Sequence, residues 1–289
     1  MTALVVAHEN GLCPDKISIY MVSITLAESE VKLSYDTADG IRRSDLWVIN
    51  KSPYHFRYHM EHRDEKSSKA LTFGAAAHKW ILEPDMFGEE FALAPEFNRR
   101  TKEGREAWGN FELICSERNL SIITDDEFDT ISEMAGALEE NPLAWQLLQG
   151  KHEQEYYWTD DLTREKCKCK VDCITEYNGK PYIVDYKTTD SCEDGHFERS
   201  ARKYGYQFQA GMYCEGVFQN ELEEHGFAFV AQEKTAPYAV RVYLCDPEWI
   251  KRGYDKFREL IGIYHECNVS GNWYGYEGPD GIPVELVEE

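Results

Sequence analysis

The dipeptide Asn178-Gly179 constrains the fold of this chain more than any other feature, because it lies between two stretches rich in β-branched and aromatic residues. Asn-Gly favours the positive φ angles of a type I′ turn, which joins two antiparallel strands through two residues. A turn of this kind fixes the register of the hairpin. Asp172 is therefore predicted to lie directly opposite Asp185, and Lys170 directly opposite Lys187.

The predicted register places two acids and two lysines on one face of the sheet, because opposed residues and residues two apart share a face. The facing carboxylates of Asp172 and Asp185 repel each other and destabilise the hairpin unless something offsets the repulsion. A divalent cation can do so, since carboxylate oxygens are the ligands that Mg²⁺ prefers, and they also suit Mn²⁺. The hairpin alone leaves two interpretations open: a metal site, or a solvent-exposed face with cross-strand ion pairs.

Patterns along the rest of the chain predict a first group of helices, then three strands, then further helices and strands. Helices are predicted at residues 44–50, 53–62, 69–83, 102–118, 125–139, 142–149, 193–203, 206–219 and 247–267, and strands at 152–158, 165–175, 180–189, 225–233 and 238–244. This order is typical of an α/β or α+β domain in which helices flank a central mixed sheet. We predict an irregular N-terminal arm over residues 1–40 and a single domain over residues 41–289 that ends in an acidic tail.

The charge of the chain, taken alone, argues against a nucleic-acid-binding protein, because the formal net charge is −22 and phosphate contacts need Lys and Arg. Basic residues nevertheless cluster at 98–105, 166–170 and 199–203, which allows a basic site inside an acidic shell. The N-terminus lacks a basic region followed by a long apolar stretch, so we expect a cytoplasmic protein. Nine cysteines without a secretion signal predict reduced thiols.

The acid and lysine of the hairpin also carry a family resemblance. Asp172, followed by Asp185-Tyr186-Lys187, resembles the PD-(D/E)xK nuclease signature. The segment from Gly74 to His78 resembles the GxxxH helix of the RecB-like branch, and the segment from Gln209 to Tyr213 resembles its QxxxY helix. The four motifs follow one another in the order expected for that branch.

Longer phrases of the sequence are most similar to RecE-type (exonuclease VIII-like) phage and prophage exonucleases. They are SPYHFRY, LTFGAAAHKWILEPDMF, CKCKVD and VDYKTT, and the similarity spans residues 41–245. The hairpin between the two acids is slightly longer than in the RecE-type pattern, which the turn tolerates. The resemblance implies the fold of the PD-(D/E)xK restriction-endonuclease-like core.

The resemblance also implies an activity and partners. A RecE-type enzyme degrades linear double-stranded DNA 5′→3′ and leaves 3′ single-stranded tails for recombination by strand annealing. It requires Mg²⁺, for which Mn²⁺ can substitute, forms a ring-shaped homo-oligomer, expected to be a tetramer, and acts with a RecT-like annealing protein. Two alternatives stay open: a structure-specific or restriction-type endonuclease of the same superfamily, and a catalytically silent DNA-binding protein. The complete Asp–Asp–Lys set argues against the silent protein.

The matched motifs assign roles to individual residues. Asp172, Asp185 and the backbone carbonyl of Tyr186 are expected metal ligands, and the resemblance adds His78, which by itself is also typical of ordinary helix packing. Lys187 is expected to position the attacking water or to stabilise charge on the phosphate. A lysine that is partly desolvated and close to cations can have a lowered pKa, which suits a base.

Several further residues are candidates for contact with DNA. Gln209 and Tyr213 are four residues apart, so one helical face carries both, and they contact DNA or orient the lysine. The other candidates are basic: Lys168, Lys170, Arg199, Arg202 and Lys203, with Arg99, Arg100, Lys102 and Arg105 at the mouth of a channel. For Lys168 and for the 98–105 cluster, a solvated surface is the competing interpretation.

The cysteines do not predict a second metal centre. Cys167, Cys169 and Cys173 are expected on the strand face opposite Asp172, packed in the core as small hydrophobic residues, so we expect no zinc site. Cysteines after the QxxxY helix are widely spaced, so no iron–sulfur cluster is expected either.

Overall fold

The structure, a computed structural model, describes residues 5–8, 17–20, 35–62 and 69–283. Its centre is a five-stranded mixed sheet in which the strands lie side by side in sequence order. The strands are β5 (Lys151–Thr159), β6 (Lys166–Tyr177), β7 (Lys180–Thr189), β8 (Gly226–Glu233) and β9 (Val240–Leu244). Within this sheet only the β7–β8 pair is parallel, because α8 (His196–Tyr204) and α9 (Tyr206–Glu221) form the crossover between them.

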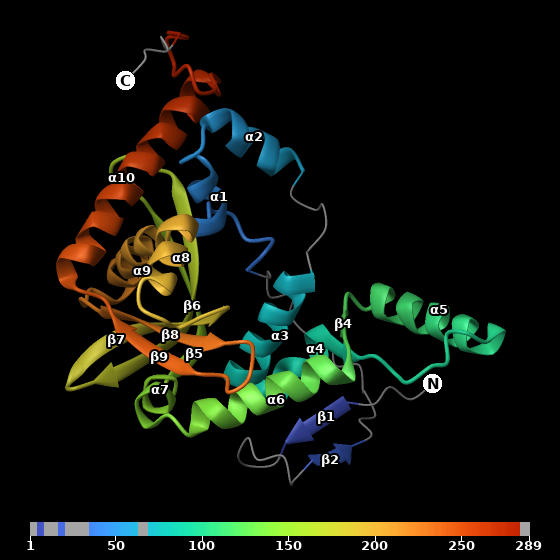
Figure 1. The fold of residues 1–289 in the computed structure, drawn as a ribbon. Coiled ribbons are helices and arrows are strands. Elements are labelled where there is room, and N and C mark those ends of the chain that lie inside the picture. The colour runs from blue at the N-terminus through green and yellow to red at the C-terminus, as the bar shows by residue number, and fades with distance from the viewer. Residues whose placement is uncertain (1–4, 9–16, 21–34, 63–68, 284–289) are drawn as a thin grey trace, which may run out of the picture.

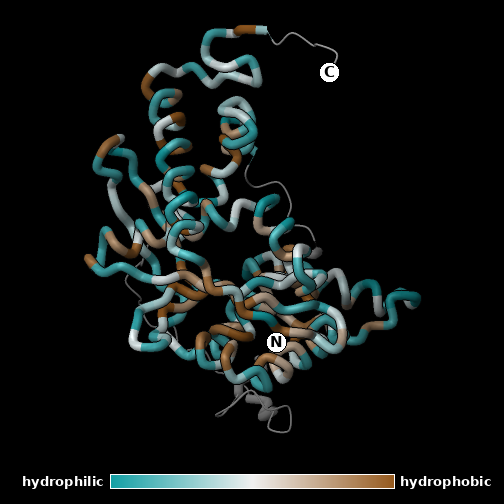
Figure 2. Tube along the Cα trace, turned by 60° about the vertical axis from the view of Figure 1, so that its left-hand side comes forward, coloured by the Kyte–Doolittle hydropathy of each residue, from teal (hydrophilic) through white to brown (hydrophobic). Residues whose placement is uncertain are grey.

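Helices cover both faces of this sheet (Figure 1). One face packs against α3 (Lys69–Leu82), α6 (Asp125–Glu139) and α7 (Pro142–Leu147), which together enclose one hydrophobic cluster. The other packs against α1 (Arg43–Val48), α2 (Pro53–Glu61), α8, α9 and α10 (Pro247–Ser270) around a second cluster. Figure 2 shows that hydrophobic segments concentrate around the sheet. The predicted mixed α/β domain, with helices on both sides of a central mixed sheet, is confirmed.

Smaller elements complete the described chain. β3 (Phe91–Leu93) pairs in parallel with β4 (Ser121–Ile123), near η2 (Pro84–Met86), α4 (Phe87–Glu90) and α5 (Lys102–Glu117). A short antiparallel pair, β1 (Val5–His8) and β2 (Ile17–Tyr20), lies inside the predicted irregular arm, and the sequence analysis did not predict it. Among the described helices, none combines the length and the apolar character needed to cross a membrane.

The β6–β7 hairpin has the predicted register. Asn178 and Gly179 have φ angles of 52° and 72°, as a type I′ turn requires. Backbone pairing runs from Tyr177 with Lys180 to Cys173 with Val184. The ladder ends there, one residue before the two aspartates, so these acids occupy the open end of the hairpin where the strands separate.

The alternation of side chains along β6 is interrupted at this open end. Cys167 and Cys169 belong to the cluster beneath α9, whereas Cys173 belongs to the cluster beneath α3, so the prediction that the three share one face is wrong. The interruption coincides with Glu153 of β5, which has a φ angle of 52° and lies between the pairs that flank Asp172. A strand residue in the left-handed region departs from the regular pleat, and the faces exchange there.

Candidate metal centre at the open end of the hairpin

The carboxylate of Asp172 on β6 contacts residues of both β7 and α3. Its carboxylate accepts a hydrogen bond from the backbone N–H of Tyr186 at 2.8 Å, which joins β6 to β7 beyond the last ladder pair. The same oxygen lies 2.8 Å from Nε2 of His78. Burial alone would raise the pKa of Asp172, but the charges of His78 and Lys187 and the hydrogen bonds outweigh it and lower this pKa. The acid is therefore held as a carboxylate.

Helix α3 brings His78 over this carboxylate from the face opposite α9. Its Nδ1 lies 3.5 Å from a carboxylate oxygen of Glu153, which also forms an ion pair with Lys170. One ligand atom from each of His78, Glu153 and Asp172 lies within 4.8 Å of the other two. Although burial acts to lower the pKa of His78, the two carboxylates raise it overall. These three side chains form a compact set of possible metal ligands.

Asp185 contributes the second predicted carboxylate and is only 2% exposed. Its Oδ1 accepts a hydrogen bond from Nε2 of Gln209 on α9. Its Oδ2 forms an ion pair with Lys187 but accepts no hydrogen bond from any described residue. Burial, reinforced by the charge of Asp172, raises the pKa of Asp185 to about 6. This carboxylate is costly to keep charged in its buried place, and a cation bound beside it would lower that cost.

Lys187 remains a charged ammonium in this arrangement. Burial acts to lower its pKa, but Asp185 and Asp172 raise it overall. In the absence of a cation the two nearby carboxylates outweigh desolvation, and the lowered pKa expected for this lysine beside bound cations stays a prediction. The ring of Tyr206 lies 5.2 Å from its Nζ and adds a cation–π contact.

The donor set fits a divalent cation. The carboxylates of Glu153 and Asp172 and the imidazole of His78 form one cluster, and the carboxylate of Asp185 lies beyond it, paired with Lys187. Carboxylate oxygens and an imidazole nitrogen are two donor types that Mn²⁺ and other divalent metals accept. The observation that favours such a ligand most directly is that one ligand atom from each of His78, Glu153 and Asp172 lies within 4.8 Å of the other two. His78, Asp172 and Asp185 are the predicted ligands, and Glu153 joins them. The carbonyl of Tyr186 stays a prediction.

Sequence reasoning missed Glu153. Its position in β5 depends on the register of the β5–β6 pair, and the turn between these strands, residues 160–165, carries no Asn-Gly signal. Its left-handed backbone and its contacts with His78 and Lys170 appear only in the folded chain. Non-glycine residues in this region of φ are often part of functional sites.

Arg43 is a second residue that the sequence did not indicate. It opens α1, and its guanidinium donates a hydrogen bond to the carbonyl of Tyr204. Burial lowers the pKa of Arg43, whereas Tyr213, Asp185 and Tyr206 act to raise it, so the guanidinium lies near Asp185 of β7. Its Nε has no hydrogen-bond partner among the described residues. A half-buried arginine with an unused Nε donor close to Asp185 is suited to a phosphate group.

The predicted DNA contacts separate into buried and exposed residues. Lys168 is 2% exposed and donates to the carbonyls of Tyr35 (2.7 Å) and Ala38, so its assignment to DNA is wrong. It instead anchors residues 35–41 onto β6, where Ile41 bridges Cys167. The alternation of lysines along this strand could not indicate that Lys168 is buried, because the segment that covers it, residues 35–38, lies far away in the sequence.

Gln209 is also buried, at 4% exposure, and its contact is with Asp185. This geometry favours the role of holding the carboxylate over direct contact with DNA. Tyr213 packs against the core beneath α9, and burial raises its pKa. Lys170 is engaged by Glu153, whereas the basic residues of α8 are exposed: Arg199, Arg202 and Lys203. These three stay predicted DNA contacts.

Comparison with known proteins gives one family match. The model of a family described as "PDDEXK-like domain of unknown function (DUF3799)" matches residues 43–278. No curated protein matches significantly. The crystal structure of a "Putative exonuclease" from Eubacterium rectale is similar, with a TM-score of 0.56 and 16% identity, covering 92% of this chain and 96% of that one. The structure of "SSO0001" reaches a TM-score of 0.35 at 14% identity, covering 80% and 79%, too low a similarity to support an inference. The likeness at 16% identity shows a shared fold.

Proposed function

The chain belongs to the PDDEXK-like DUF3799 family, and from this premise we propose that it is a metal-dependent nuclease that hydrolyses phosphodiester bonds in DNA. The observation that carries the proposal is the convergence of Asp172, Asp185, Lys187 and His78 where the hairpin strands separate. Two neighbouring acids whose pKa values are shifted in opposite directions, raised for Asp185 and lowered for Asp172, are typical of a catalytic site.

Each side chain has a role that follows from its contacts. When bound, a divalent cation lowers the pKa of a coordinated water and offsets charge on the phosphate. Tyr186 N–H fixes the carboxylate of Asp172, and Gln209 fixes that of Asp185, so both oxygens are positioned before substrate arrives. Lys187 is protonated and is therefore suited to stabilise negative charge on the phosphate as water adds and the ester oxygen leaves. Arg43 can assist from α1.

We propose further that the enzyme is an exonuclease that digests linear duplex DNA 5′→3′, with Mg²⁺ as its metal and Mn²⁺ as a substitute. The resemblance of residues 41–245 to RecE-type exonucleases supports this, as does the exonuclease description of the structural neighbour. On the same basis we propose a ring-shaped tetramer, a RecT-like annealing partner, and a role in recombination through 3′ single-stranded tails.

Digestion of end-labelled DNA tests the activity. We expect linear duplex to lose a 5′ label first in Mg²⁺, to stay intact in EDTA, and closed circles to resist digestion. Loss of the 3′ label first would reverse the polarity, and cleavage of closed circles would favour an endonuclease. Equal digestion by wild type, Asp185→Asn and Lys187→Ala would show that these residues are wrongly assigned.

A further inference from the structure

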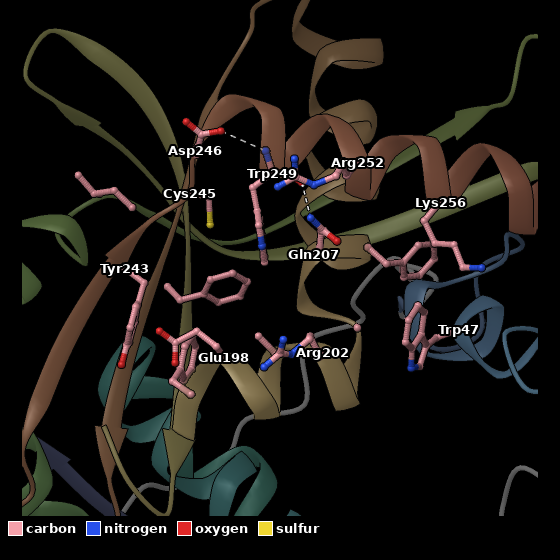
Figure 3. Close-up of a pocket in the computed structure, with 16 residues that line it drawn as sticks. Trp47, Glu198, Arg202, Gln207, Tyr243, Cys245, Asp246, Trp249, Arg252 and Lys256 are labelled. Atoms are coloured by element: carbon pink, nitrogen blue, oxygen red, sulfur yellow. Dashed lines mark hydrogen bonds between the residues drawn. The ribbon is translucent and has the colours of Figure 1, made fainter. Parts of the chain in front are cut away.

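A pocket of about 710 Å³ lies beside the catalytic strand, on the α9 face of the sheet. Its volume is within the range of small-molecule sites. α8 and α10 form its sides, β8 and β9 contribute to its floor, and Trp47 of α1 closes one end. Figure 3 shows Tyr243 at one end of the pocket and Trp47 at the other, with Arg202, Gln207 and Arg252 between them.

The walls combine aromatic rings with cations. The aromatic residues are Trp47, Phe197, Phe208, Phe229, Tyr243 and Trp249. Trp47 stacks on Phe208 at 5.3 Å, and Phe197 stacks on Tyr243 at 4.3 Å, so two pairs of rings are held in fixed orientations. Such surfaces accept a flat ring, and nucleic-acid bases stack on them regardless of sequence.

The basic side chains of the pocket differ in whether they form an ion pair. Lys256 pairs with Glu259 at 2.7 Å, but Arg202 and Arg252 form no ion pair with any described residue. Of the two acids in the lining, Asp246 is used as the N-cap of α10, and Glu198 lies toward the Tyr243 end in Figure 3. Two free guanidinium groups in a chain of net charge −22 are complementary to a small anion.

The pocket is joined to the metal centre through the start of α9. The ring of Tyr206 stacks on Phe229 with centroids 5.3 Å apart, and Nζ of Lys187 lies 5.2 Å from the centroid of the same ring. Gly205, with a φ of 67°, lets Trp47 approach so closely that an added Cβ would lie 2.5 Å from the indole. The same helix carries Gln209, which holds Asp185. A ligand in the pocket therefore contacts the element that positions the catalytic carboxylate.

We propose that this pocket binds one nucleotide, with its base against the aromatic rings and its phosphate on Arg202 and Arg252. This inference rests on the proposed function, because it names the part of the substrate strand that reaches beyond the metal centre. Both a terminal nucleotide of the DNA strand and a released mononucleotide carry this chemistry.

Calorimetric titration of the whole protein in EDTA with deoxyadenosine 5′-monophosphate tests the proposal without catalysis. We expect saturable binding, at least tenfold weaker binding of deoxyadenosine, and at least tenfold weaker nucleotide binding by Arg202→Ala and by Arg252→Ala. Lys251→Ala is the matched control, since Lys251 precedes Arg252 on α10 but pairs with Asp255 outside this pocket. No saturable binding, or equal binding by all variants, overturns the proposal.

A second arm identifies the source of the nucleotide. If a short duplex with a 5′-phosphate displaces the mononucleotide in EDTA, the pocket holds the end of the strand; if it does not, the pocket holds the released product. Either result supports a nucleotide site. If the wild-type protein digests DNA but binds no mononucleotide, the nucleotide site is rejected and the proposed nuclease function stands. If it binds the mononucleotide but digests no DNA, the proposed nuclease function is rejected.

Discussion

Two buried aspartates of this protein have opposite surroundings. Asp160, in the turn after β5, is 4% exposed and accepts hydrogen bonds from Thr163 N–H (2.8 Å), Thr163 Oγ1 (2.6 Å) and the guanidinium of Arg258 on α10. Burial acts to raise its pKa, but these partners lower it to about 2. Asp185, at 2% exposure, has a pKa raised to about 6 and an oxygen without a hydrogen bond from the described residues.

The difference distinguishes a carboxylate that stabilises the fold, that of Asp160, from one that is suited to bind a ligand, that of Asp185. Every charged oxygen at Asp160 is matched by donors of the chain itself, so the acid joins the turn to α10. Asp185 is paired with Lys187 and accepts a hydrogen bond from Gln209, but burial and the facing acid Asp172 outweigh these partners and keep its pKa raised, so a bound cation would stabilise its charged form further. Local violations of good pairing are expected at functional sites, and here one chain provides both cases.

The largest expected contrast is in activity. Asp185→Asn should reduce the digestion rate about a thousandfold or more, because the site loses several kcal/mol of charge stabilisation in the transition state. Asp160→Asn should digest linear duplex at the wild-type rate per folded molecule. Rates are measured with saturating Mg²⁺ at equal folded concentration, and an Asp185→Asn enzyme as fast as Asp160→Asn would remove the distinction.

The next contrast is in the response to metal. Mg²⁺ at a hundred times its dissociation constant should stabilise the folded wild type by about 2.7 kcal/mol, seen as a higher unfolding temperature than in EDTA. Asp172→Asn should lose this rise, and Asp160→Asn should keep it. The comparison fails if Mg²⁺ shifts the unfolding temperature of Asp172→Asn as much as that of the wild type.

The third contrast is in the free energy of unfolding, which, unlike the activity, should depend on Asp160. Asp160→Asn should lower the free energy of unfolding by about 2 kcal/mol near pH 7, since a pKa lower in the folded state stabilises the fold. This contribution is present above the unfolded pKa near 4 and is lost as the pH falls toward 2, so the two proteins should converge there. Urea unfolding followed by circular dichroism measures it. Asp161→Asn, an exposed neighbour, is the control and should change stability little.

The smallest contrast concerns the acid that the sequence did not indicate. Glu153→Gln should raise the Mg²⁺ concentration needed for half-maximal activity about tenfold, because it removes one ligand or its support beside His78. Glu155→Gln, an exposed acid two residues along the same strand, should leave it unchanged. Equal Mg²⁺ requirements for both variants would place Glu153 outside the metal centre.

The sequence by itself predicted the hairpin register, the five strands of the central sheet with the helices that flank it, and the motif residues of the candidate metal centre, but not the short elements β1 to β4 and α4. Asn178-Gly179 sets the turn, and the turn sets the pairing up to Cys173 and Val184, because both depend on backbone geometry within a few residues. His78 and Gln209 could be named because they stand at fixed places within recognisable helices.

Only the tertiary structure decided what surrounds these residues. Glu153 reaches His78 from a strand about seventy-five residues away, Lys168 is covered by residues 35–38, and Arg43 approaches Asp185 from α1. Local sequence pattern carries no information on such contacts, because burial and charge–charge interactions depend on which distant segments pack together. The pKa of Lys187 shows the same limit: its direction follows from the balance between desolvation and two carboxylates, which exists only once the chain has folded.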